Sequence, residues 1–176
     1  MRAMFSSRPP LPQSLPLRRL TRAEFERLDA ERFFANERVE LVFGMVIAMP
    51  PIDAAHGESV DRLDAMLRRQ LDDRARVRCQ GAFAASDNSE PQPDVYVFPI
   101  GDYWDVNPDR AYLVIEVARS SLEYDRETKA PLYALGQVDE YWIVDHAEGV
   151  VEVYRDRHDG RWRTLTTAVS DILPPV

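Results

Sequence analysis

The stretch Pro93-Asp94-Val95-Tyr96-Val97-Phe98 decides the fold of this chain, together with the run Leu113-Val114-Ile115-Glu116-Val117-Ala118 that follows it after a loop. Both are short apolar runs of the kind that form strands buried in a sheet. Each run carries one carboxylate, at the start of the first and in the middle of the second. The two runs therefore predict neighbouring core strands that bring Asp94 and Glu116 close together.

The region ends in Asp125-Arg126-Glu127-Thr128-Lys129, which contains the only lysine of the sequence. The 22 basic residues are 21 arginines and this lysine. Lysine is a compact charge whose pKa can shift, whereas arginine is a wide planar fork that stays protonated. Two interpretations remain open: Lys129 serves chemistry that arginine does not, or it forms a surface i,i+4 pair with Asp125.

Length and composition predict one globular domain over residues 21–176, preceded by a flexible arm over residues 1–20 that is rich in proline and serine. No apolar run approaches the roughly 20 residues that span a bilayer, so we expect no membrane partner. The single cysteine, Cys79, fits a reducing compartment and predicts a cytoplasmic protein. The net charge of −8 argues against a protein that coats nucleic acid through a basic face, but not against a nuclease, because a metal ion inverts the local field of acidic residues.

Hydrophobic patterns predict the elements around the two core strands. They indicate a short helix after the capping box of Thr21 and Glu24, a hairpin over residues 39–49 that turns at Gly44, a helix over 56–74, strands over 140–145 and 150–154, and an edge strand over 161–167.

A further helix is predicted to end near Gly136, and its start depends on Pro131. Proline lacks an N–H and breaks a helix interior, but the first turn tolerates it. We therefore expect Thr128 to be the N-cap, which places Lys129 at the beginning of this helix.

The carboxylates and the lysine suggest metal-assisted chemistry. An ionised Glu116 in an apolar strand is costly unless it is paired or metal-bound. Two nearby carboxylates raise each other's pKa, and a divalent cation relieves the repulsion. Mg²⁺ prefers a few carboxylates and several waters, so Asp94 and Glu116 are candidate ligands for Mg²⁺ or Mn²⁺. Lys129 would neutralise phosphate charge or position the attacking water.

Two further residues have open assignments. Glu40 is either an outward-facing strand residue or a member of the acidic site. His56 is either an ordinary first-turn residue of its helix or part of the site.

Taken together, these residues resemble the Uma2 family of restriction-type endonucleases, within the PD-(D/E)XK nuclease superfamily. The resemblance spans roughly residues 21–156. It is carried by Val39-Glu40-Leu41-Val42-Phe43-Gly44, His56-Gly57, Pro93-Asp94-Val95, Val114-Ile115-Glu116-Val117, Asp125 with Lys129 and Tyr133, and Glu140-Tyr141-Trp142-Ile143-Val144-Asp145.

The resemblance implies an α/β (α+β) fold with a restriction-endonuclease-like core, a mixed central β-sheet flanked by helices, and an extra N-terminal β-hairpin. It implies that Asp94, Glu116 and Lys129 are catalytic, that Asp94 and Glu116 bind the metal, and that Glu40 completes the acidic set, with His56 and Asp125 as additional site residues. The superfamily lysine normally lies two residues after the glutamate, where this sequence has Ala118, and Lys129 on the next helix takes its place.

Three functions follow as hypotheses. The first is a Mg²⁺-dependent DNA endonuclease, for which the resemblance implies a homodimer because superfamily enzymes that cut both strands pair two subunits. The alternative is a catalytically inactive nuclease-fold module that binds nucleic acid or a protein partner. The third is a metal-free hydrolase that uses Ser120 or Ser121 with a histidine, but the sequence lacks the Gly-x-Ser-x-Gly motif that would support it. Zinc is not predicted either, because the histidines and the single cysteine lie far apart in the sequence.

Overall fold

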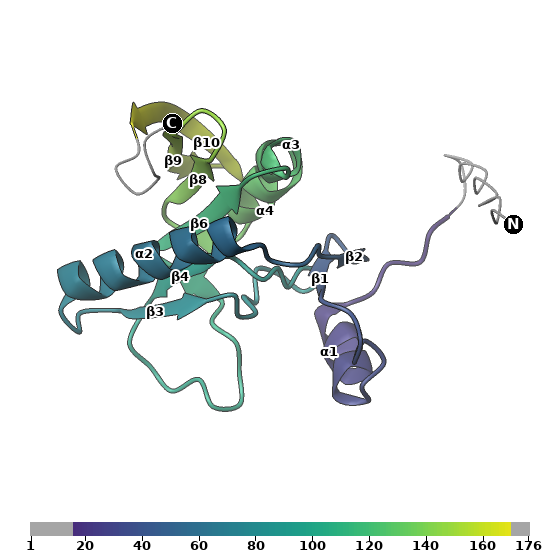
Figure 1. Cartoon of the computed structure of the whole chain (residues 1–176). Helices are drawn as coiled ribbons and strands as arrows, with labels where there is room; N and C mark the ends of the chain where they lie inside the picture. Colours follow the sequence, from purple (N-terminus) through teal and green to yellow (C-terminus); the bar gives the residue numbers. More distant parts are fainter. Residues whose placement is uncertain (1–15, 170–176) are drawn as a thin grey trace, which may run out of the picture.

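The computed structural model describes residues 16–169, so most of the predicted N-terminal arm lies outside the described residues (Figure 1). A six-stranded mixed sheet of order β10-β9-β8-β6-β4-β3 forms the centre of the fold. Only β6 and β8 pair in parallel, and the other neighbours are antiparallel. The strands are β3 (Arg76–Cys79), β4 (Val95–Phe98), β6 (Leu113–Ala118), β8 (Tyr141–Asp145), β9 (Val150–His158) and β10 (Arg161–Val169). The predicted mixed sheet is confirmed, with β10 at its edge.

The two faces of the sheet are covered by different helices, and successive residues of β6 point to opposite faces. Ile115 and Val117 pack in the same cluster as Leu63 of α2 (Ala54–Leu71), which crosses the sheet (Figure 1). Val114 and Ala118 pack in a second cluster, with residues of α4 (Ala130–Leu135). Glu116 alternates with Ile115 and Val117, so its carboxylate points to the α4 side.

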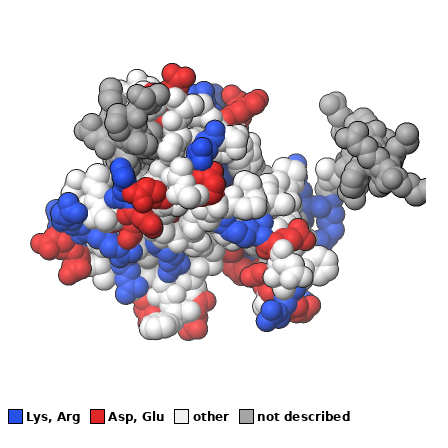
Figure 2. All heavy atoms as spheres, in the orientation of Figure 1, with Lys and Arg blue, Asp and Glu red and all other residues white. Residues whose placement is uncertain are grey.

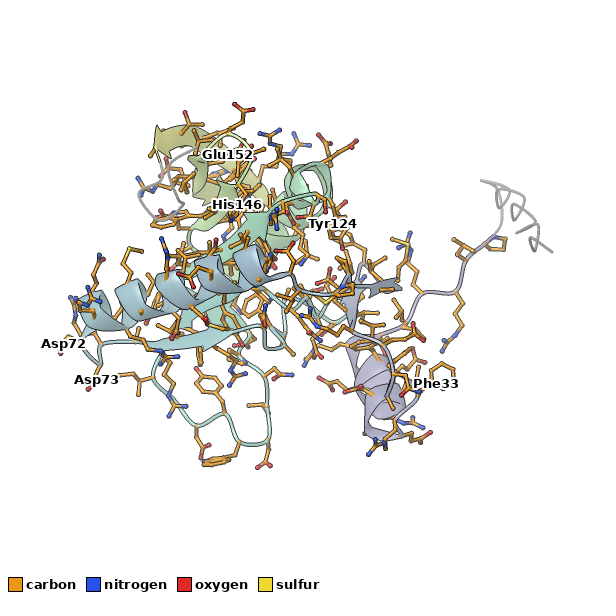
Figure 3. All side chains as sticks on the ribbon, in the orientation of Figure 1. Phe33, Asp72, Asp73, Tyr124, His146 and Glu152 are labelled. Carbon is orange, nitrogen blue, oxygen red and sulfur yellow. The ribbon has the colours of Figure 1, made fainter. Side chains whose placement is uncertain are left out.

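The helix predicted over 56–74 begins earlier and ends earlier than expected. The side chain of Asp53 caps the N-terminus by accepting from the backbone N–H of His56. Asp72 and Asp73 adopt left-handed backbone conformations, with φ of 46° and 59°, which stops the helix at Leu71. Figure 3 shows both aspartates together at that end of α2.

The helical segment after β6 differs from the prediction, and Thr128 is not its N-cap. Helical conformation begins at α3 (Leu122–Tyr124), passes through a π-helical turn η1 (Asp125–Lys129) and continues into α4. The backbone N–H of Ala130 donates to the carbonyl of Asp125, five residues back. The wide turn directly precedes Pro131, whose ring would clash with the carbonyl four residues earlier in a regular α-helix.

The predicted hairpin is confirmed as β1 (Val39–Val42) and β2 (Met45–Ala48). Phe43 and Gly44 form its turn with φ of 48° and 77°, values that favour glycine at the second position. The predicted capping box of Thr21 and Glu24 begins α1 (Arg22–Ala30). Two reciprocal hydrogen bonds between Leu41 and Glu90 attach β1 to the chain entering β4. A second small sheet pairs β5 (Arg110–Ala111) with β7 (Gln137–Val138).

Glu90 is a buried carboxylate whose ionisation costs stability. It is 6% exposed, and its Oε2 accepts no hydrogen bond within the described part of the chain. Burial, followed by the hydrogen bond and charge of Glu26, raises the pKa of Glu90 to about 7. The folded state therefore binds this proton more tightly than the unfolded chain, and stability falls as pH rises from about 4.5 to about 7.

Glu90→Gln is expected to raise the free energy of unfolding by about 1–3 kcal/mol at pH 8. The amide stays neutral and can donate to Glu26. The gain should shrink towards zero below about pH 4, where Glu90 is protonated in both the folded and the unfolded state. Urea denaturation at pH 4 and pH 8 measures both values, with Glu148→Gln at an exposed position as control. A Glu90→Gln gain that is the same at both pH values would contradict the assignment.

Candidate active site

Five elements bring all six predicted site residues to one pocket. Glu40 comes from β1, Asp94 directly precedes β4, Glu116 lies on β6, and η1 carries Asp125 and Lys129. His56 projects from the first turn of α2. All six line a pocket of about 330 Å³. These residues are up to 89 positions apart in the sequence, from 40 to 129, and the fold gathers them.

Lys129 lies at the centre of this cluster. Its Nζ is 2.9 Å from Glu40 Oε2 and 2.9 Å from Glu116 Oε1. Lys129 is 3% exposed, and its ion pairs are with these two glutamates rather than with Asp125. The interpretation of Lys129 as half of a surface pair is therefore wrong.

Asp94 and Glu116 are held by each other's strands. The backbone N–H of Asp94 donates to Glu116 Oε2 at 3.3 Å, and the N–H of Val117 donates to Asp94 Oδ2 at 2.8 Å. The hydroxyl of Tyr133 donates to Glu116 Oε1 at 2.7 Å. The antiparallel register that pairs Val95 with Ile115 produces this reciprocal arrangement.

Glu40 faces inward, so of its two open assignments the outward-facing one is wrong. It is 2% exposed. Besides Lys129, it accepts from the Tyr124 hydroxyl at 3.0 Å and from the backbone N–H of Gln92 at 3.1 Å. Figure 3 shows Tyr124 between the helical segment and the hairpin. Three groups from separate elements thus fix this carboxylate.

His56 contacts the site directly, because its Nε2 lies 2.8 Å from Asp94 Oδ1. That hydrogen bond raises the pKa of His56, and partial burial opposes the rise. Asp125 is also buried, and its Oδ2 accepts from Ser121 Oγ at 2.6 Å. Ser121 therefore serves as a donor to a carboxylate and is not paired with a histidine as a nucleophile would be.

The charges of the site are unequal. Burial raises the pKa of Glu116 to about 8, an effect that Lys129 opposes and that Asp94 and the other carboxylates reinforce. Burial also raises the pKa of Asp125 to about 6. For Lys129 burial acts in the opposite direction, but Glu116 and Glu40 raise its pKa overall and keep it charged. Carboxylates therefore outnumber the cations that neutralise them.

The donor set suits a hard divalent cation with few protein ligands. Across residues 16–169, no group of three or more His, Cys, Asp or Glu side chains is arranged to hold a metal. Glu116 Oε2 and both oxygens of Asp94 each accept one hydrogen bond, so each keeps a lone pair. Two carboxylates completed by waters are the usual set for Mg²⁺. The pocket therefore suits a divalent cation because of the carboxylates of Asp94 and Glu116 and because its acidic groups outnumber its cations.

Sequence reasoning did not single out Tyr124, Gln92 or Tyr133 as site residues, although Tyr133 was part of the family resemblance. Tyr133 follows Lys129 by four positions, a helical spacing that places both on one face and could have identified it. The contacts of Tyr124 and Gln92 depend on where the hairpin packs, and no local pattern encodes that.

The mixed sheet with helices on both faces is a fold that is also found in a solved structure. That structure, from Anabaena variabilis ATCC 29413, is described as "a putative nuclease belonging to DUF820"; its TM-score is 0.68 at 18% identity, over 89% of each chain. Residues 22–175 match the model of the Uma2 family, described as "Putative restriction endonuclease", and the chain belongs to this family. A search of curated proteins found no match.

Proposed function

We propose that this protein is a metal-dependent endonuclease that hydrolyses phosphodiester bonds in DNA. One observation carries the proposal: Lys129 Nζ lies 2.9 Å from both Glu40 and Glu116 in a pocket that Asp94 also lines. A lysine and a set of acids converging in one cavity are the groups that metal-assisted phosphodiester hydrolysis requires. Family membership agrees with this chemistry.

Asp94 and Glu116 would hold Mg²⁺ or Mn²⁺. When bound, such an ion polarises the phosphorus–oxygen bond and lowers the pKa of a bound water. The protein keeps the two carboxylates in place through backbone donors from β4 and β6 and through Tyr133 and His56. These donors fix the site before substrate arrives, so little reorganisation is needed.

Lys129 would stabilise negative charge that develops on the phosphate. Its ammonium is buried, where the low dielectric strengthens charge interactions. Its three donors exceed the two carboxylate contacts, which leaves one N–H for a substrate oxygen or the attacking water.

The proposal includes a homodimer, since cutting both strands of a duplex takes two such sites. It also includes a cytoplasmic location, which the single cysteine fits. Between residues 16 and 169, no helix has the length and apolar character needed to cross a bilayer.

The second candidate is a module that binds nucleic acid or a protein without cutting. The net charge of −8 favours the form of this candidate that binds a protein partner, because non-specific DNA affinity depends on basic residues. Figure 2 shows acidic and basic side chains interspersed over the visible face, without a continuous basic area.

One experiment separates the two candidates. Supercoiled plasmid, linear duplex and single-stranded RNA are incubated with the protein in Mg²⁺, in Mn²⁺ and in EDTA. An endonuclease nicks or linearises DNA only with a metal ion present. Intact substrates under every metal condition, with retained binding, would support the non-cutting module and overturn hydrolysis.

A further inference from the structure

Arg38, directly before β1, has an unused guanidinium beside the candidate active site. It is partly buried and lines the same pocket as Asp94, Glu116 and Lys129. Among the residues that the structure describes, its side chain has no hydrogen bond, ion pair or ring contact. An arginine held in a pocket without a partner has its full donor fork available.

The other long-chain cations of the pocket are already compensated. Lys129 is bound between Glu40 and Glu116, and Arg119 forms an ion pair with Asp53. The pocket is otherwise acidic, so an anionic substrate would meet repulsion unless an uncompensated cation receives it. Arg38 is the one described lining residue with a permanent charge that meets this need.

Arg38 shares the pocket with the proposed metal ligands. His56, whose Nε2 lies 2.8 Å from Asp94 Oδ1, lines this pocket as well. A phosphate group bound near Asp94 would therefore lie in the same cavity of about 330 Å³ as Arg38.

We propose that Arg38 binds a phosphate group of the nucleic-acid substrate through its guanidinium fork. This inference rests on the proposed function, because it takes DNA as the substrate. Two parallel N–H donors match two non-bridging phosphate oxygens, a geometry that lysine does not reproduce. Arg38 would thus bind substrate, while Lys129 acts at the reacting phosphate.

A structural role for Arg38 is the competing explanation. Arg38 also borders a second pocket, of about 370 Å³, that is lined by Glu26, Asp29, Glu37 and Glu90. As a counter-charge for those acids, Arg38 would affect stability and leave DNA binding unchanged. Comparison of stability with affinity separates the two roles.

The test measures binding of a fluorescently labelled DNA duplex by anisotropy over a range of salt concentrations, in EDTA and in Ca²⁺. Arg38→Gln is expected to weaken binding about tenfold and to reduce the slope of log K against log salt by about one. Arg38→Lys should keep the slope, because the charge remains, and lose only part of the affinity. Arg69→Gln, an equal change of charge at an exposed position on α2 outside the pocket, should match the unmodified protein.

Thermal unfolding of each variant accompanies the binding data. A lower melting temperature for Arg38→Gln with unchanged DNA affinity would overturn the inference in favour of the structural role. Cleavage by the unmodified protein, with Arg38→Gln binding DNA as Arg69→Gln does, would remove this inference and leave the proposed function intact. DNA binding without cleavage, weakened by Arg38→Gln, would keep the inference and remove hydrolysis. A protein that binds no DNA would remove both.

Discussion

The Lys129→Met variant is expected to lose at least about a hundredfold in the rate of DNA cleavage, because loss of one donor to the developing charge costs that much in comparable sites. Methionine fills a similar volume without the charge. Lys129→Arg should also be strongly impaired, since the wide guanidinium does not fit between two carboxylates that each lie 2.9 Å from Nζ. Initial rates of plasmid nicking measure both variants.

Stability must be separated from chemistry in this experiment. Removing Lys129 leaves Glu40 and Glu116 buried without their counter-charge, which costs about 3–5 kcal/mol when one partner of a buried pair is lost. The double variant Glu40→Gln, Lys129→Met restores the charge balance of that pair and should recover most of the unfolding free energy but none of the activity. Full cleavage by a folded Lys129→Met protein would refute the assigned role.

Asp94→Asn is expected to abolish metal binding at the pocket and to reduce cleavage at least about a hundredfold, since metal-ion stabilisation of the transition state amounts to several kcal/mol. Asparagine keeps the shape and can still accept from the Val117 N–H, so the sheet should remain intact. Calorimetric titration with Mn²⁺ follows binding independently of cleavage.

Asp61→Asn provides the matched control, because Asp61 is exposed on α2 and lies outside the pocket. Both variants remove one negative charge. Equal Mn²⁺ affinity in Asp94→Asn and Asp61→Asn would show that the ion, if bound, has other ligands. That result would also leave the paired carboxylates without their proposed role.

Much of the fold follows from local patterns in the sequence. Apolar runs with bounding turns identify β4, β6 and β8, and Gly44 marks the hairpin turn. The orientation of Glu40 could not be predicted, because all four residues of β1 are buried and the strand has no alternation of polar and apolar positions. Its partners come from the helical segment and from the chain before β4, which only the tertiary fold brings together.

The start of the helical segment could not be predicted for a different reason. Local rules place Pro131 in a first turn, whereas the protein continues the helix through it with the wide turn η1. Tertiary packing overrides the local preference here: Asp125 and Lys129 are both buried in η1, one bonded to Ser121 and the other to Glu40 and Glu116.

The wide turn η1 also determines the direction in which later side chains point. Every residue added to a helix rotates the next by about 100° around the axis. Deleting Glu127 would therefore rotate the Lys129 ammonium away from the two glutamates that it contacts, and the hydroxyl of Tyr133 would move with it. The π-helical turn contains one residue more than a regular α-helical turn, and this extra residue sets the angle at which Lys129 projects from the helix. Homologous chains with a lysine on the same helix can be compared by whether they also contain the extra residue.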